Sequence, residues 1–190
     1  MLTEKVRLSK DRKLKVEEKI LVAGFGGQGM MFLGKTLAWA ATKENKFTTW
    51  IPSYGGEMRG GTAHCFIKIS SKRIASPVFE HPTSMFIFNQ PSFDKFIKRA
   101  EKDSLVIING SLVKPKKVRA VKPKTVPLNE LALSLGSLKV ANLIAIGIFL
   151  REKKILEPET VRKVLKMGFP QNKSLLELNL KAFQLGLDYD

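Results

Sequence analysis

With 190 residues, 44% of them hydrophobic, the chain is long enough for one sizeable core and too short for several large domains. Its single cysteine, Cys65, excludes an intrachain disulfide and, from this chain alone, a four-thiolate iron–sulfur cluster or a zinc ribbon. A formal net charge of +16 at pH 7 permits an acidic partner, a nucleic acid or a membrane surface, and does not choose among them.

The N-terminal part of the chain changes character at residue 19. Residues 1–18 alternate Lys, Arg and Glu with few large apolar side chains, which predicts a basic extension ahead of a single domain over residues 19–190. The apolar run from Lys19 to Ala23 ends in glycines and is typical of a buried first strand. From Gly29 onward, apolar residues recur at helical spacing, so a strand, a glycine turn and a helix follow in order.

The glycine turn, GFGGQGMMFLGKT, fits two phosphate-binding patterns in overlapping registers. Gly24, Gly26 and Gly29 match the pattern of a dinucleotide fold, whereas Gly29 to Thr36 match a P-loop. The first pattern needs an acid at the end of the second strand, expected at 47–51, and none is there. The second needs an apolar strand that ends in aspartate, whereas the two candidate strands end in Asn89 and Asn109. It would also place bulky Met and Phe side chains in the loop. The missing acidic residues exclude a P-loop NTPase and argue against an NAD site.

What remains is a tight turn whose backbone N–H groups point outward at the start of a helix. Such a turn suits an anion or a close backbone contact. The alternative is that the glycines only allow the strand and the helix to pack closely.

A second glycine-rich segment, PSYGGEMRGGTAHC, begins at Pro52. Glu57 and Arg59 stand between two glycine pairs, and the guanidinium could fork onto a phosphate or a carboxylate. A salt bridge or hydrogen bonds that fasten the loop explain the pair equally well. His64 beside Cys65 could contribute to a metal site, but two histidines and one thiol fall short of the usual ligand sets, so we expect an ordinary pair of strand residues.

The rest of the chain alternates strands with helices. We expect strands at 47–51, 63–70, 85–89 and 104–109, with an amphipathic helix over 91–102. The C-terminal third reads as helical. The signals for its helix ends are Asn129 as a cap, Gly136 as an interruption, Pro158 as a first-turn residue, Gly168 as a stop and Ser174 as the last cap before Gly186. This order predicts an α/β fold, a Rossmann-like three-layer sandwich with a largely parallel or mixed sheet and a helical C-terminal region.

The chain resembles the gamma subunit of the 2-oxoacid:ferredoxin oxidoreductases, the pyruvate, 2-oxoglutarate and 2-ketoisovalerate type. The resemblance rests on five stretches, GFGGQGMMFLGKTLA, PSYGGEMRGGTAHCFIKIS, IASPVFEHP, FNQPSFDKF and LKVANLIAIGIFL, and it covers about residues 18–151. One departure is Gly56, where the family usually has proline; this loosens the loop but removes no charged group.

This resemblance implies a subunit of an enzyme that decarboxylates a 2-oxoacid oxidatively, forms an acyl-CoA and passes electrons to ferredoxin. Family members bind thiamine diphosphate between alpha and beta subunits and hold iron–sulfur clusters in beta, delta or fused chains. The resemblance therefore implies that this chain alone binds none of these cofactors, nor CoA, and is inactive in isolation. Its implied partners are the alpha and beta subunits and, in some enzymes, a delta subunit. A short separate chain favours 2-oxoglutarate as substrate, with pyruvate and branched-chain 2-oxoacids open.

Five residues become candidates for contact with partner subunits or with the phosphates of CoA, and we prefer an interface. They are Gly26, Gly27, Gln28, Glu57 and Arg59. The corresponding domain of the fused, single-chain enzymes is associated with the approach of CoA. The resemblance assigns no catalytic and no metal-binding residue to this chain.

Two alternatives come from other functional classes. A nucleic-acid-binding protein would fit the charge, but the tryptophans and tyrosines are not interleaved with the basic clusters as a stacking platform requires. A stand-alone nucleotide-binding Rossmann-like protein would need the acidic ribose or magnesium ligand discussed above, and this sequence lacks it. The basic run VKPKKVRAVKPK from Val113 predicts an exposed loop or edge hairpin, whose charge could guide CoA or an acidic ferredoxin or could simply be solvated.

The sequence gives no sign of membrane insertion. Its longest apolar stretch, VANLIAIGIFL from Val140, contains Asn142 and is too short to span a bilayer. The N-terminus has no apolar core of signal-peptide length. We therefore expect a cytoplasmic protein with no membrane contact.

Overall fold

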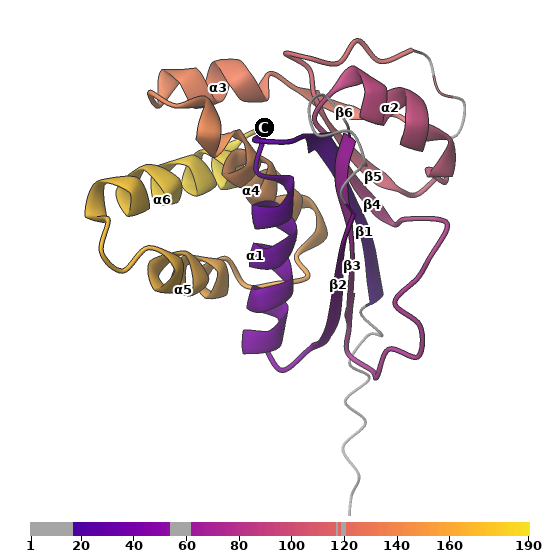
Figure 1. Cartoon of the computed structure of the whole chain (residues 1–190), viewed down its shortest axis with the longest axis horizontal. Helices are drawn as coiled ribbons and strands as arrows, with labels where there is room; N and C mark the ends of the chain where they lie inside the picture. The colour runs from indigo at the N-terminus through magenta and orange to yellow at the C-terminus, as the bar shows by residue number, and fades with distance from the viewer. Residues whose placement is uncertain (1–16, 54–61, 117, 119–120) are drawn as a thin grey trace, which may run out of the picture.

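The computed structural model describes residues 17–53, 62–116, 118 and 121–190, and it shows one sheet flanked by helices (Figure 1). The strands are β1 Glu17–Phe25, β2 Phe47–Ser53, β3 Thr62–Ser70, β4 Ser84–Ile87, β5 Leu105–Asn109 and β6 Lys124–Val126. The helices are α1 Met30–Lys43, α2 Gln90–Phe96, α3 Leu128–Ser134, α4 Ala141–Lys153, α5 Pro158–Gly168 and α6 Lys173–Asp188, with 3-10 turns η1 Ile97–Arg99 and η2 Leu138–Val140. None of these described helices is long and apolar enough to cross a membrane.

The sheet is mixed, and its strand order is β2-β3-β1-β4-β5-β6. Strands β1, β4, β5 and β6 run parallel, whereas β3 is antiparallel to both β1 and β2. Strand β1 lies in the middle and reads as a continuous apolar run because both of its faces are covered. The predicted α/β fold with a mixed sheet is confirmed.

Alternate side chains of β1 enter two separate cores. Ile20 and Val22 pack with α1, α4, α5 and α6, and Leu21 and Ala23 pack with α2 and η1 on the other face. Figure 1 shows this asymmetry: α1, α3, α4, α5 and α6 lie on one side of the sheet and α2 on the other. The predicted three-layer sandwich is therefore confirmed, with one thick helical layer and one thin layer.

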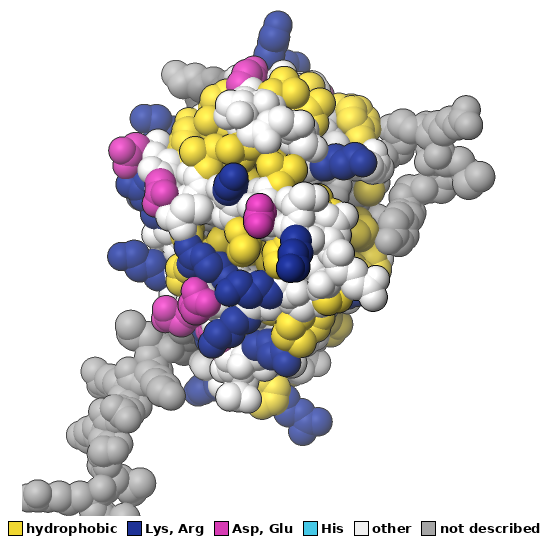
Figure 2. Space-filling view, turned by 90° about the vertical axis from the view of Figure 1, so that its left-hand side faces the viewer, with side chains coloured by type: hydrophobic (Ala, Val, Ile, Leu, Met, Phe, Trp, Pro, Cys, Tyr) yellow, Lys and Arg dark blue, Asp and Glu magenta, His cyan; other side chains and the backbone are white. Residues whose placement is uncertain are grey.

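The outer surface of the thick helical layer is mixed in character. Figure 2 shows Lys and Arg side chains with Asp and Glu among them, and hydrophobic side chains gathered near the top, over α3. Exposed leucines in this region are Leu133, 57% exposed, and Leu138, 51% exposed. Lysines of this layer also find carboxylate partners, as in the Lys46–Glu44 pair at 2.7 Å.

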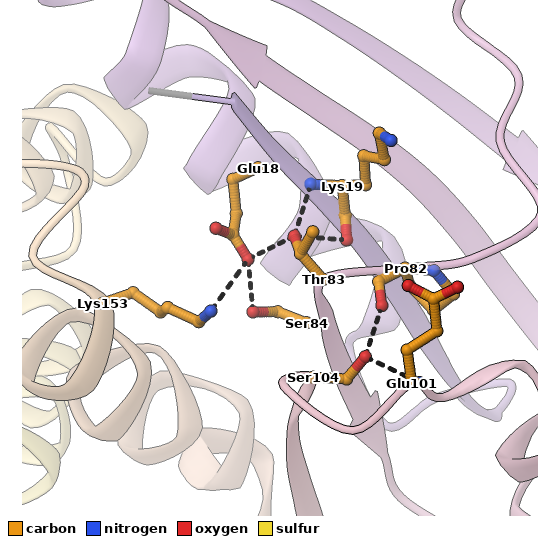
Figure 3. A network of polar contacts seen from close by, with 8 residues as sticks. All are labelled: Glu18, Lys19, Pro82, Thr83, Ser84, Glu101, Ser104 and Lys153. Atoms are coloured by element: carbon orange, nitrogen blue, oxygen red, sulfur yellow. Dashed lines mark hydrogen bonds and ion pairs between the residues drawn. The ribbon is translucent and has the colours of Figure 1, made fainter. Parts of the chain in front are cut away.

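A polar network joins the amino ends of the parallel strands (Figure 3). The buried carboxylate of Glu18 accepts hydrogen bonds from Thr83 Oγ1 at 2.6 Å and Ser84 Oγ at 2.5 Å. Lys153 Nζ, from the end of α4, lies 3.8 Å from the same oxygen. Ser104 Oγ donates to the carbonyl of Pro82 at 2.8 Å and so ties β5 to β4. Side-chain hydrogen bonds therefore link the start of β1 to the residues just before β4 and β5 at this end of the sheet.

Several sequence predictions differ from the structure at element ends. Pro158 opens α5 and Gly168 is its last residue, as predicted. The predicted cap Asn129 is wrong: α3 begins at Leu128, and the Asn129 side chain instead accepts a hydrogen bond from Asn109 at 2.9 Å. Ser174 is also wrong as the cap of α6, because Asn172 accepts from the N–H of Leu175. Helix α3 has Pro127 at its N-cap and no side-chain cap, whereas Asn172 takes the capping role at α6.

The basic segment before α3 was expected to be an exposed loop or an edge hairpin. Its last residue, Lys124, begins β6, a short edge strand that pairs in parallel with β5. A parallel neighbour cannot form a hairpin with the strand before it, because the chain must cross back over the sheet first. The structure describes residues 113–116, 118 and 121–123 of this segment, and they lie outside helices and strands.

Helices α4 and α6 cross at two glycines. A Cβ at Gly186 would lie 2.0 Å from the carbonyl oxygen of Ile144, and one at Gly147 would lie 2.4 Å from that of Phe183. Backbone carbonyls cannot give way as flexible side chains can, so only glycine allows this approach. Gly186 lies within α6, which ends at Asp188, so this glycine serves the contact with α4 and does not mark the end of the helix.

We expect Gly186→Ala to lower the free energy of unfolding by about 2 kcal/mol or more, because the added methyl group forces the two helices apart. Urea unfolding monitored by circular dichroism measures the change. Gly168→Ala is the matched control, since a Cβ there meets nothing within 4 Å, and it should change the stability by less than about 1 kcal/mol. Equal stability of the two variants would contradict the packing argument.

Candidate functional site

The carboxyl ends of β1 and β4 form the natural ligand position of this fold. The helix that follows β1, α1, covers one face of the sheet, and the helix that follows β4, α2, covers the other. Two adjacent parallel strands whose connections leave in opposite directions create a crevice at their carboxyl ends. The first glycine motif lies at this switch point.

The turn between β1 and α1 needs glycine at particular positions. Gly27 has φ +89° and Gly29 has φ +78°, in the left-handed region that favours glycine. A Cβ at Gly29 would also lie 2.1 Å from Nδ2 of Asn142. Gly26 differs from both in its φ, which is outside that region, and a Cβ there meets nothing within 4 Å. The fold of this chain therefore does not require glycine at position 26.

Gln28 fastens the turn to the neighbouring strand. Its Oε1 accepts a hydrogen bond from the N–H of Phe25 at 2.6 Å, and its Nε2 lies 3.4 Å from the carbonyl oxygen of Phe88. One carboxamide thus spans the gap between the end of β1 and the end of β4. Gln28 is half-buried, so the bridge forms the floor of the crevice, while Gly26 and Gly27 are exposed above it.

Asn142 holds the other side of the turn and was not predicted as a site residue. Its Nδ2 donates to the carbonyl oxygen of Gly29 at 3.2 Å, although 113 residues separate the two. Its Oδ1 is buried and has no hydrogen-bond partner among the described residues. The signal in the sequence was the single asparagine within an otherwise apolar helix, since a buried polar side chain needs a partner.

The structure argues against both nucleotide-binding registers of the glycine motif. Helix α1 begins at Met30, so the loop of the P-loop register is helical, and Met30 and Leu33 are buried against the sheet. Gly34 belongs to a helix-to-sheet contact, because a Cβ there would lie 2.5 Å from Cys65 Sγ. Strand β2 is separated from β1 by β3, so its end does not face the turn as the second strand of a dinucleotide fold would. Neither nucleotide pattern is realised in full.

A pocket of about 250 Å³ opens beside the turn. Its walls are partly polar and partly apolar, and Lys139 contributes the one ammonium group. The lining residues are Gly27, Gln28, Phe88, Leu112, Asn129, Leu138, Lys139 and Ala141. Leu112 is 44% exposed and Leu138 is 51% exposed, so the rim presents apolar surface to whatever approaches.

The asparagines that end two strands have structural partners. Asn89 Oδ1 caps α2 by accepting from the N–H of Ser92 at 2.8 Å, and Asn109 Oδ1 accepts from the N–H of Ser111 at 3.3 Å. Both side chains are at least 99% buried. The Nδ2 of Asn89 has no hydrogen-bond partner among the described residues, which leaves a buried donor near the end of β4.

The second glycine motif leaves the sheet next to the first. Phe25 of β1 pairs with Thr62, where β3 begins, and Ser53, where β2 ends, pairs with His64. The two ends of the segment between β2 and β3 therefore lie at the same edge of the sheet as the glycine turn. Glu57 and Arg59 themselves lie outside the described residues, so their roles stay predictions.

His64 and Cys65 point to opposite faces of β3. Cys65 is buried against α1, and burial raises the pKa of its thiol to about 12. The His64 ring packs 5.0 Å from the Phe96 ring on the α2 face, and burial together with Lys95 lowers its pKa. Across 17–53, 62–116, 118 and 121–190, no three His, Cys, Asp or Glu side chains gather as metal ligands. The expected ordinary pair of strand residues agrees with this geometry.

Comparison with known proteins gives consistent results along the chain. A family model described as pyruvate ferredoxin/flavodoxin oxidoreductase matches residues 19–189. The ketoisovalerate oxidoreductase subunit VorA of Methanothermobacter marburgensis is 33% identical over 91% of this chain and 36% of its own length. The 2-oxoglutarate synthase subunit KorC of Methanocaldococcus jannaschii is 30% identical over 93% of this chain and 96% of its own length. The chain thus spans about a third of the VorA relatives and nearly all of KorC.

Solved structures share the fold. The 2-oxoglutarate:ferredoxin oxidoreductase of Magnetococcus marinus, with 2-oxoglutarate, coenzyme A and succinyl-CoA bound, matches with a TM-score of 0.82 and 21% identity, over 90% of this chain and 30% of that one. The gamma subunit of the keto/oxoacid ferredoxin oxidoreductase of Geobacter sulfurreducens PCA matches with a TM-score of 0.78 and 24% identity, over 90% and 96% of the two chains.

We expect Gln28→Leu to lower the free energy of unfolding by about 1–3 kcal/mol, because the partly buried N–H of Phe25 loses its acceptor. Amide hydrogen exchange at Phe25 should accelerate by the same local opening. Gln28→Glu keeps the acceptor oxygen and should protect the Phe25 amide better than leucine does. Unchanged exchange in the leucine variant would show that the carboxamide does not fasten the turn.

The lowered pKa of His64 predicts a pH dependence of stability. In the unfolded chain the imidazole takes up a proton near its ordinary pKa of 6.5, whereas in the folded chain it does so only at lower pH. Stability from this group is therefore complete above pH 6.5 and is lost as the pH falls through the folded-state pKa. Thermal unfolding of the wild type and His64→Gln across this range should show a shallower acid slope in the variant. Equal pH dependence of the unfolding temperature in the wild type and the variant would contradict the assigned role of His64.

Proposed function

The chain belongs to the pyruvate ferredoxin/flavodoxin oxidoreductase family, and we propose that it works as the gamma subunit of a 2-oxoacid:ferredoxin oxidoreductase. The observation that carries the proposal is the family match over residues 19–189, which includes both glycine motifs. In this role the chain is a non-redox subunit of a complex with alpha and beta subunits, and with a delta subunit in some enzymes. The complex converts a 2-oxoacid and CoA to an acyl-CoA and passes electrons to ferredoxin.

The described residues fit a supporting role better than a redox role. The one thiol, Cys65, is buried against α1, and burial raises its pKa to about 12, so it stays protonated near neutral pH in this environment. In this proposal the iron–sulfur clusters and thiamine diphosphate belong to partner subunits. This chain contributes the open carboxyl end of its sheet.

The crevice suits either a partner's backbone or the phosphates of CoA. The fold of this chain does not require glycine at position 26. Close approach of another molecule to the turn would explain why the residue is a glycine. The backbone amide of Gly27 together with Lys139, which both line the pocket beside the turn, would hold phosphate oxygens. When bound, CoA supplies the thiol that accepts the acyl group. We propose that partner contact dominates at Gly26, Gly27 and Gln28.

The relatives suggest which 2-oxoacid the complex uses. We propose 2-oxoglutarate first, since KorC subunits are matched along nearly their whole length, and ketoisovalerate second, since VorA subunits have the higher identity. The 2-oxoacid itself would be recognised mainly by the partner subunits. A stand-alone nucleotide-binding protein is not favoured, because neither nucleotide pattern is complete.

Anaerobic purification of the tagged chain from its host tests the subunit role. The eluate should contain large partner chains and should reduce viologen only when a 2-oxoacid and CoA are both supplied. Comparison of 2-oxoglutarate, ketoisovalerate and pyruvate then identifies the substrate. A chain that purifies alone, or tight binding of NAD or ATP to it, would overturn the subunit role.

The variant Gly26→Trp should fold normally, because the space around position 26 is open, and should still disturb the complex. Loss of partner chains at unchanged thermal stability assigns the turn to an interface. Normal assembly with a KM for CoA raised about tenfold or more assigns it to CoA. Gly168→Trp, equally open and at the end of α5, is the control and should leave both unchanged. A normal complex with a normal KM in the Gly26 variant would remove the turn from the site.

A further inference from the structure

The fold brings two basic segments together on the thin layer of the sheet. The first is the stretch of α2 and η1 that carries Lys95, Lys98 and Arg99. The second is the loop after β5, whose Val113 and Val121 are buried in the same core cluster as Phe93 and Phe96 of α2. The N–H of Lys114 also donates to Gln90 Oε1 at 2.9 Å, at the start of α2. Segments that are apart in sequence therefore form one surface.

The positive charge on this surface is concentrated. Lys95 Nζ lies 5.2 Å from the centre of the Phe96 ring, and Arg99 Cζ lies 5.5 Å from it. The His64 ring packs against the same phenyl ring at 5.0 Å, and both cations act on its titration. Lys98 on η1 and Lys114, Lys116 and Lys122 in the loop after β5 are also exposed.

Little negative charge opposes these cations. No Asp or Glu occurs between Leu105 and Asn129. Among the described residues, none of the ion pairs includes any of these cations. The one carboxylate on α2, Asp94, accepts a hydrogen bond from Gln90 at 3.0 Å. The thick helical layer contrasts with this, since carboxylates stand among its lysines (Figure 2).

We propose that this surface is a docking site for an acidic segment of a partner protein. We name it the α2 face, defined by Lys95, Lys98, Arg99, Lys114, Lys116 and Lys122. Charge complementarity identifies the partner as rich in Asp and Glu. The inference goes beyond the subunit role and does not rest on it.

Neighbouring apolar groups favour a protein over a nucleic acid. Leu112, 44% exposed, stands at the start of the basic loop and also lines the crevice, so the α2 face adjoins the crevice. An apolar contact beside a charged rim is the usual composition of a protein interface. The aromatic rings of α2, Phe93 and Phe96, are 2% and 1% exposed, so they offer no platform for stacked bases.

Fluorescence anisotropy with the full chain tests the proposal. The probes are a fluorescein-labelled oligoglutamate peptide and an oligothymidylate of equal charge, each measured at low and physiological ionic strength. The α2-face variant combines Lys95→Gln, Lys98→Gln and Lys116→Gln. The control variant carries the same loss of charge on the helical layer as Lys35→Gln, Lys163→Gln and Lys166→Gln. All six side chains are exposed, so both variants should keep the wild-type unfolding temperature.

We expect the peptide to bind the wild type and the control, and to bind the α2-face variant about tenfold more weakly or worse with a smaller salt dependence. Imidazole NMR signals of His64 should shift on peptide addition to the wild type. Equal weakening in both variants would overturn the site in favour of overall charge. Tighter binding of the oligothymidylate through the same lysines would overturn the class of partner. Absence of peptide binding at physiological ionic strength would overturn the proposal itself.

Discussion

The chain must leave a central strand that is largely buried and enter a helix on one face of the sheet within four residues. Backbone sterics allow this only with left-handed conformations at Gly27 and Gly29, and the turn must also leave room for the amide of Asn142. Once the turn is formed, its own N–H and carbonyl groups need partners. Gln28, within the turn, accepts from the N–H of Phe25 at the end of β1, and Asn142, from the distant helix α4, donates to the carbonyl of Gly29. The position of α1 and the floor of the crevice both follow from this turn.

The sequence predicted the elements well because their signals are local. Apolar runs with β-branched residues marked the strands, and glycine and proline marked several helix ends. The predicted cap residues of α3 and α6 were wrong for two reasons. Asn129 is held by Asn109, which is remote in sequence, and at α6 the nearby Asn172 accepts the capping hydrogen bond in place of Ser174. Strand β6 was missed because three residues at a sheet edge leave almost no periodicity to detect.

The candidate site was predicted only in part. The glycine turn could be located from its spacing, and its two nucleotide registers could be tested by the acids they lack. The roles of Asn142, Lys139 and Leu138 depend on how α4 and η2 lie against the turn, which no local pattern encodes. The grouping of the two basic segments on one face depends in the same way on buried Val113 and Val121. Long-range packing decided what local sequence could not.

Helix α4 contacts three separate parts of the domain along its length. At one end Asn142 holds the glycine turn, in the middle Gly147 touches the backbone of α6, and near the other end Arg151 pairs with Asp190. These three points span much of a helix about 20 Å long, with every residue from Ala141 to Leu150 buried. Because the contact with the glycine turn and the contact with α6 are made by one helix, the place of Asn142 beside the turn depends on how α4 packs against α6. Geometry at the glycine turn is thus set in part by residues at the far end of the polypeptide.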